Sequence, residues 1–132
     1  MGVFRAFRKI GPGDTEQELD GAALEGLICQ QLRAWIHYTK GVHDLFFWRT
    51  KAGLEVDFIV YGEQGFWAIE VKNSRTVSPD DVRGLNHFSQ DYPTVKTMIL
   101  YRGASRMEYK GILCIPVDQF LRQLRPNTPL EK

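Results

Sequence analysis

The fold is decided by the stretch Trp67–Ser74, WAIEVKNS, in which an acid and a base interrupt an otherwise apolar strand. Strand side chains alternate between the two faces of a sheet, so Glu70 and Lys72 are expected to point to the same face. One interpretation is a structural ion pair at the end of a strand. The other is a metal ligand beside a cation that contacts phosphate.

The stretch LEVDFIVYG (54–62) reads as the preceding strand, joined to this one by a tight turn at EQG (63–65). Alternation along this strand predicts that Asp57 lies on the face opposite to Val56 and Phe58. The two strands are then neighbours in one antiparallel hairpin, which brings an acid from each strand to the same part of the sheet.

Asp57 and Glu70 are therefore expected to lie close together, since counting back from the turn places Asp57 opposite the residue after Glu70. Two carboxylates at such short range repel each other unless a cation lies between them. Their hard oxygens suit Mg²⁺ or Mn²⁺, ions that can activate water and neutralise charge on a phosphodiester. The Lys72 ammonium would help to place the phosphate.

A long helix is predicted ahead of these strands, from a capping box at TEQE (15–18) to about Thr39. Stepping about 100° per residue places Glu25 inside the sector of apolar side chains, which is the buried side of the helix. An acid there is either directed toward the same site as Asp57 and Glu70, or is a partly exposed residue at the margin of the apolar stripe.

The remaining elements complete an α/β order of helix, three strands, helix, two strands and helix, which predicts a mixed sheet flanked by helices. Ser78 and Pro79 mark the start of the middle helix, which must end before Pro93. The other predicted elements are the strands DLFFWR (44–49), VKTMILYR (95–102) and GILCIP (111–116), and the closing helix PVDQFLRQL (116–124). We divide the chain into an N-terminal arm (1–19), one domain (20–124) and a C-terminal tail (125–132) that is expected to be frayed.

Composition limits the classes of function. The chain has 132 residues, 43% of them hydrophobic, and a formal net charge of +1, so we expect one domain without a general attraction for polyanions. No apolar run is long enough to span a bilayer, and Cys29 and Cys114 lie apart in apolar stretches, as reduced core cysteines do. We therefore expect a cytoplasmic protein with no membrane partner, in which any nucleic-acid site is local.

The order of these residues resembles a known family. A helical Glu25, then Asp57, then twelve residues, then Glu70-Val71-Lys72 resembles the PD-(D/E)xK nuclease superfamily, which has the restriction-endonuclease-like fold with an α-β-β-β-α-β core. More closely, GAALEGLICQQL, FFWRTKAGLEVDFIV and WAIEVKNS resemble the C-terminal domain of unknown function of bacterial and archaeal AAA-type ATPases. The resemblance covers roughly residues 20–124.

This resemblance implies a role for each matching residue. Asp57 and Glu70 would bind the divalent metal ion, Mg²⁺ or Mn²⁺, and the backbone carbonyl of Val71 would complete the shell. Glu25 would hold a metal-bound water or a second ion, and Lys72 would act near the attacked phosphate.

The chain also departs from the pattern, because Val56 stands where the superfamily has proline, and no GxxxxGK[ST] ATP-binding motif is present. We expect either an excised domain of an ATPase or an orphan domain.

Two functions fit these residues. The first is a metal-dependent nuclease that hydrolyses DNA phosphodiester bonds. The second is a non-catalytic domain that binds nucleic acid or protein and positions an AAA-type ATPase. The presence of both Glu70 and Lys72 favours the first. The near-neutral net charge favours the second, or a chain that gains affinity from a fused partner or as a homodimer.

Overall fold

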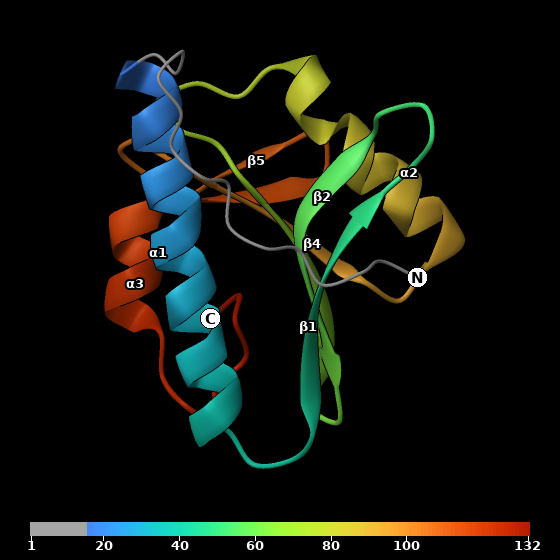
Figure 1. Cartoon of the computed structure of the whole chain (residues 1–132), viewed down its shortest axis with the longest axis vertical. Helices are drawn as coiled ribbons and strands as arrows, with labels where there is room; N and C mark the ends of the chain where they lie inside the picture. The colour runs from blue at the N-terminus through green and yellow to red at the C-terminus, as the bar shows by residue number, and fades with distance from the viewer. Residues whose placement is uncertain (1–15) are drawn as a thin grey trace.

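The structure is a computed structural model that describes residues 16–132, so the predicted cap at Thr15 lies outside the described residues. Within residues 16–132, three α-helices surround one six-stranded mixed sheet (Figure 1). The elements are α1 (Glu16–Tyr38), β1 (His43–Arg49), β2 (Glu55–Gly62), β3 (Gly65–Val71), the 3-10 helix η1 (Pro79–Val82), α2 (Arg83–Asp91), β4 (Lys96–Tyr101), β5 (Met107–Tyr109), β6 (Ile112–Pro116) and α3 (Val117–Gln123).

The predicted elements are found, with one addition. The short strand β5 was not predicted, because three residues carry too little alternation to be recognised. It pairs with β6 across a two-residue turn in which Lys110 and Gly111 both have positive φ angles of 49° and 81°. Such angles are those of a tight hairpin turn, and they are more typical of Asn-Gly than of Lys-Gly.

The sheet has the strand order β1-β2-β3-β4-β6-β5. The first three strands pair antiparallel, β3, β4 and β6 run parallel, and β5 is antiparallel at the far edge. The parallel pairing of β3 with β4 follows from the η1–α2 crossover between them. As a result, the carboxyl ends of β3, β4 and β6 lie at the same edge of the sheet.

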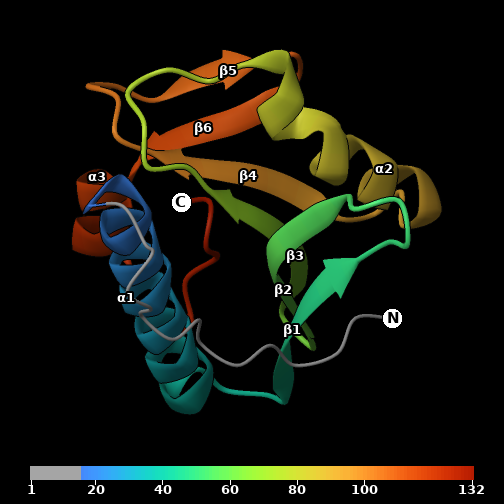
Figure 2. The same cartoon turned by 45° about the horizontal axis from the view of Figure 1, so that its top comes forward.

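Helices cover both faces of the sheet and form two hydrophobic cores. Figure 2 shows α1 and α3 side by side on one face and α2 across the sheet from them. Leu32 of α1 and Phe120 of α3 pack in the first core, and Phe88 of α2 packs in the second. Cys29 and Cys114 are buried free thiols on opposite faces, which agrees with the predicted reduced core cysteines.

A β-bulge interrupts β2 at the position of the predicted site. Between the pairs Phe46–Ile59 and Trp48–Val56, β1 has one residue whereas β2 has two, Asp57 and Phe58. Consequently Val56 packs in the same core as Ile59, while Phe58 packs on the other face. The simple alternation predicted for this strand is therefore wrong here, because an extra residue resets the side-chain direction.

The β2–β3 hairpin has a register one residue away from the predicted one. Gly62 pairs with Gly65 across a two-residue turn, and Phe58 pairs with Ile69. Continuing this register places Asp57 level with Glu70 rather than with the residue after it. The predicted proximity of Asp57 and Glu70 is confirmed, and the two residues lie directly opposite each other rather than one residue apart.

The C-terminal tail is packed rather than frayed, which corrects the prediction. Leu130 is 1% exposed and belongs to the core on the α1 side. The indole N–H of Trp35 donates to the carbonyls of Arg125 and Thr128, and that of Trp67 donates to the Glu131 carboxylate. Figure 2 accordingly shows the C-terminus beside the sheet on the α1 side. Two buried tryptophans that need acceptors thus hold the tail against the domain.

Within the described part of the chain, no helix combines the length and the apolar character that crossing a membrane would require.

Candidate active site at the ends of strands β2 and β3

Two carboxylates meet where the pairing of β2 with β3 ends. The Val71 N–H donates to Oδ2 of Asp57 at 2.9 Å, and the Asp57 N–H donates to Oε1 of Glu70 at 3.2 Å. Each acid therefore accepts a backbone hydrogen bond from the other acid's strand. The β2–β3 pairing ends at Phe58 and Ile69, so these two N–H groups lie just beyond the ladder and hold the carboxylates in place.

The electrostatic state of Glu70 follows from this geometry. Burial raises the pKa of Glu70 well above its ordinary value of 4.5, and the charge of Asp57 and the hydrogen bond between the two side chains raise it further. The backbone hydrogen bond from Asp57 opposes this rise, and the charge of Glu55 adds to it. The pair therefore retains a proton to higher pH than an isolated glutamate would, unless a cation replaces that proton.

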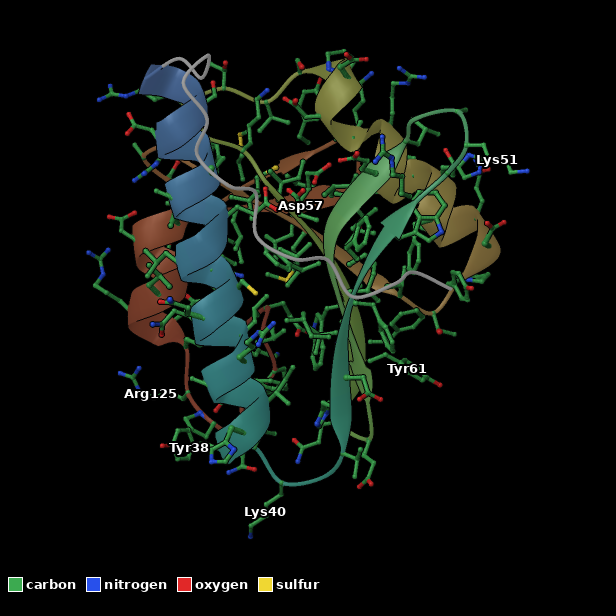
Figure 3. All side chains as sticks on the ribbon, viewed as in Figure 1. Tyr38, Lys40, Lys51, Asp57, Tyr61 and Arg125 are labelled. Atoms are coloured by element: carbon green, nitrogen blue, oxygen red, sulfur yellow. The ribbon has the colours of Figure 1, made fainter. Side chains whose placement is uncertain are left out.

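Glu70 opens onto a polar hollow on the α2 side of the sheet. The hollow has a volume of about 240 Å³, and its lining comes from the β1–β2 turn, the start of β2, the end of β3 and the η1–α2 junction: Gly53, Leu54, Glu55, Glu70, Asp80, Arg83 and Gly84. A small molecule or ion can thus reach the Glu70 carboxylate from solvent. Asp57 lies in Figure 3 in the same half of the molecule as the amino-terminal part of α1.

Lys72 follows directly after β3 and is held by an acid that sequence reasoning did not single out. Its Nζ lies 3.0 Å from Oδ1 of Asp81, which is in η1. The other carboxylate oxygen of Asp81 accepts the backbone N–H of Ser78 at 2.8 Å and its hydroxyl at 3.1 Å. Burial opposes ionisation of Asp81, but the hydrogen bonds from Ser78 and Lys72 hold its pKa below the usual value. Asp81 is therefore a charged partner that fixes the Lys72 ammonium.

The crossover helix is seated close enough to make this contact because Gly84 has no side chain. A Cβ at Gly84 would lie 2.0 Å from the carbonyl oxygen of Glu55, so α2 packs directly on the start of β2. Both Glu70 and Lys72 reach the η1–α2 segment, in agreement with their predicted shared face. The predicted helix start at Ser78 and Pro79 is confirmed, and Ser78 forms a capping box with Asp81. The contact of Asp81 with Lys72 depends on how α2 packs against the sheet.

Glu25 is half-buried on α1 and lies one helical turn after Gly21. A Cβ on Gly21 would be 4.0 Å from the Asn73 side chain, so this part of α1 flanks the segment that follows Lys72. Residues four apart share a helix face, which turns Glu25 toward the same side as Gly21. The acids that shift the pKa of Glu70 are Asp57 and Glu55, so a direct role of Glu25 in this pair stays a prediction.

The residues present fit a divalent cation held by two protein carboxylates. Among the side chains that the structure describes, no group of three or more histidines, cysteines, aspartates and glutamates gathers as a metal cage. Mg²⁺ is commonly bound through one or two carboxylates together with waters and substrate phosphates, so a cage is not required. The Asp57–Glu70 pair, in which burial and the charge of Asp57 raise the pKa of Glu70, meets that requirement.

Comparison with known proteins gives a family. A family model described as a domain of unknown function (DUF4143) matches residues 20–120. An uncharacterized protein of Mycobacterium bovis and one of Mycobacterium tuberculosis are each 28% identical to this chain over 102 residues. The match covers 76% of this chain but 22% of each relative, so the chain spans a minor part of the relatives' length. No solved structure matches.

Proposed function

The chain belongs to the DUF4143 family of domains of unknown function, and we propose that it is a metal-dependent nuclease-like domain that hydrolyses DNA phosphodiester bonds. One observation carries the proposal: Asp57 and Glu70 each accept a backbone N–H from the other's strand, and burial together with the charge of Asp57 raises the pKa of Glu70. Glu70 and Lys72 both reach the η1–α2 segment from the same face of the sheet. Such a cluster is costly for a domain that only folds and is useful for one that binds a cation.

In this proposal Asp57 and Glu70 hold Mg²⁺ or Mn²⁺, with the backbone carbonyl of Val71 as a further ligand. The bound ion supplies Lewis acidity and a water of lowered pKa. The β-bulge orients Asp57, and the Val71 and Asp57 N–H groups fix one oxygen of each carboxylate. Glu70 must release the proton that stabilises its hydrogen bond with Asp57 before the two carboxylates can bind the ion.

Lys72 would stabilise the charge that builds on the phosphate during the reaction. Hydrolysis forms a bond from the water oxygen to phosphorus and breaks the bond to one ester oxygen, which leaves with a proton. The negative charge on the phosphoryl oxygens is greatest in the transition state, where a fixed ammonium is most effective. Asp81 acts as a positioning residue, because it holds the ammonium at 3.0 Å and is itself held by Ser78.

The arrangement of elements supports a restriction-endonuclease-like core. The order α1, β1, β2, β3, α2, β4 is the one that the resemblance implies, and the two acids and Lys72 lie at the ends of β2 and β3. The relatives extend well beyond the matched part, which supports the proposal that the domain works in cis with another domain, such as an AAA-type ATPase.

A non-catalytic role in binding nucleic acid or protein is the second candidate. One observation favours it: Lys72 already has a counter-charge in Asp81, as expected for a structural ion pair. The net charge of +1 also implies weak affinity for free DNA. Only the nuclease is expected to cleave DNA, and its cleavage should depend on Lys72.

A cleavage assay separates them. Purified protein in excess, at low salt with Mn²⁺, is incubated with single- and double-stranded DNA. We expect the wild type to cleave, Lys72→Ala to lose cleavage while still binding Mn²⁺, and Glu70→Gln to lose both. Lys40→Ala is the matched control, because Lys40 is exposed and Figure 3 places it at the opposite end of the molecule from Asp57. A wild type that cleaves neither substrate, alone or fused to an ATPase partner, would refute the nuclease and favour the binding domain.

A further inference from the structure

The carboxyl ends of β3 and β4 continue side by side beyond the strands themselves. The Lys72 N–H donates to the Leu100 carbonyl at 2.8 Å, and the Arg102 N–H donates to the Ser74 carbonyl at 2.8 Å. The segment after Lys72 is further ordered by the Ser74 hydroxyl, which accepts the Thr76 N–H at 3.3 Å. This edge is therefore a fixed surface that begins at the residue proposed to meet the scissile phosphate.

Arg102 is held on this edge by a hydrogen bond to the residue next to Lys72. Its Nε donates to Oδ1 of Asn73 at 3.2 Å, which orients the guanidinium plane, although the side chain is exposed. Guanidinium carries two further nitrogens that can form parallel hydrogen bonds to one phosphate. An arginine oriented through Nε is thus prepared for a phosphate at its outer side.

The backbone that follows Arg102 is also constrained. The Tyr101 hydroxyl donates to the Ser105 carbonyl and closes the turn around Arg102. Gly103 is required in that turn, because a Cβ there would be 2.1 Å from the Tyr101 ring. The position of Arg102 is consequently fixed by the segment that follows β3 and by the turn between Tyr101 and Ser105.

This edge is the place where an open α/β sheet commonly binds its ligand, outside the carboxyl ends of parallel strands. Lys72, Arg75 and Arg102 lie along this edge; Asp81 pairs with Lys72, whereas Arg75 and Arg102 are exposed. An exposed guanidinium on this edge suits a phosphate of a nucleic-acid backbone better than a neutral ligand.

We propose that Arg102, oriented by Asn73, binds a phosphate of the nucleic-acid backbone that flanks the phosphate facing Lys72. This inference rests on the proposed function and extends it, because it assigns the edge formed by residues 72–75 and Arg102 as the track of the substrate strand. The contact positions the backbone and carries no base preference.

Binding rather than cleavage tests the inference. Fluorescence anisotropy of labelled single- and double-stranded DNA is measured with Ca²⁺ across a range of salt concentrations, and the DNA is checked for integrity afterwards. The variants are Arg102→Gln, Arg102→Lys and the control Lys40→Gln, an exposed lysine that Figure 3 places far from Asp57. Each must match the wild type in its circular dichroism spectrum.

We expect Arg102→Gln to bind about tenfold more weakly at low salt. The slope of log affinity against log salt should become shallower by about 0.9 for duplex DNA or about 0.7 for single strands, the value for one lost phosphate contact. Arg102→Lys should keep the slope but lose affinity, since an ammonium cannot be oriented through Nε. Lys40→Gln should change neither quantity.

Wild-type binding with an unchanged slope in Arg102→Gln would overturn this inference and leave the proposed function standing. Equal changes in Arg102→Gln and Lys40→Gln would also overturn it, since the effect would then be one of net charge. A wild type that neither binds nor cleaves nucleic acid would overturn the proposed function and this inference together.

Discussion

Glu70→Gln should make the metal-free protein more stable at neutral and alkaline pH. The substitution keeps the size of the side chain and leaves an amide oxygen to accept the Asp57 N–H that now binds Glu70. It removes the negative charge that Asp57 opposes, and the new amide N–H₂ can donate to the Asp57 carboxylate. A stabilising substitution at a residue of a proposed active site is the signature of a cluster retained for function.

The magnitude follows from the carboxylate pair. Two unit charges about 4 Å apart at an effective dielectric of about 20 repel by about 4 kcal/mol, which is an upper bound because Glu70 can bind a proton instead. We expect a gain in the free energy of unfolding of about 1–3 kcal/mol at pH 8.

The direction of the Glu70 pKa shift determines how the stability difference between the two proteins changes with pH. The pKa of Glu70 is higher in the folded state than its ordinary value of 4.5, so the folded state binds the proton more tightly. The contribution of Glu70 to the free energy of unfolding of the wild type is therefore fully present below pH 4.5. It is lost as the pH rises through the raised pKa that Glu70 has in the folded state. The variant lacks that decline, so the two proteins should be nearly equal at the acid end and diverge toward pH 8.

Urea unfolding followed by circular dichroism between pH 4.5 and 8.5, without divalent ions, measures this difference. Glu108→Gln is the control, because Glu108 is exposed on β5, and it should be close to the wild type throughout. The reasoning is refuted if Glu70→Gln gives no gain at pH 8, or if its gain is the same at pH 5 and pH 8.

Two further substitutions test the packing that builds the site. Leu130→Ala should lower the free energy of unfolding by about 2–5 kcal/mol, because this tail residue is buried in the core. Urea titration measures the loss, and a loss below about 0.5 kcal/mol would mean that the tail is frayed. Gly84→Ala should lower the free energy of unfolding by about 1–3 kcal/mol, because the new Cβ would meet the Glu55 carbonyl. The substitution should also reduce cleavage, because it moves Asp81 away from Lys72. A variant with wild-type stability and cleavage would contradict the direct packing of α2 on β2.

The parts of the site that depend on local pattern were predictable from the sequence. The strand that carries Glu70 is predictable because a run of apolar residues follows a glycine turn. The pairing of β2 with β3 followed from the shortness of that turn, and it brought Asp57 to Glu70. Both deductions use only neighbours along the chain.

The bulge at Asp57 could not be predicted, because it exists only in the pairing of β2 with β1. Nothing in the residues Asp57 and Phe58 marks an inserted position, since neither is a glycine and both fit the alternating pattern of a strand. The extra residue is visible only when Trp48 is found opposite Val56. It decides which way the Asp57 carboxylate is directed.

The contacts of Lys72 and of the tail were missed for a similar reason. Asp81 lies three residues after the predicted helix start at Ser78, but its contact with Lys72 depends on the close approach that Gly84 permits. The tail was expected to fray because it is polar and rich in proline. Its anchoring requires the indole donors of Trp35 and Trp67, which are far away in the sequence.

The central claim is that Asp57 and Glu70 together hold a divalent cation, and calorimetric titration of Mn²⁺ tests it most directly. We predict that the wild type binds one ion per chain, that affinity rises with pH as Glu70 releases its proton, and that Asp57→Asn loses this binding while remaining folded. Absence of binding to the wild type at every pH, or equal binding to Asp57→Asn, would contradict the account.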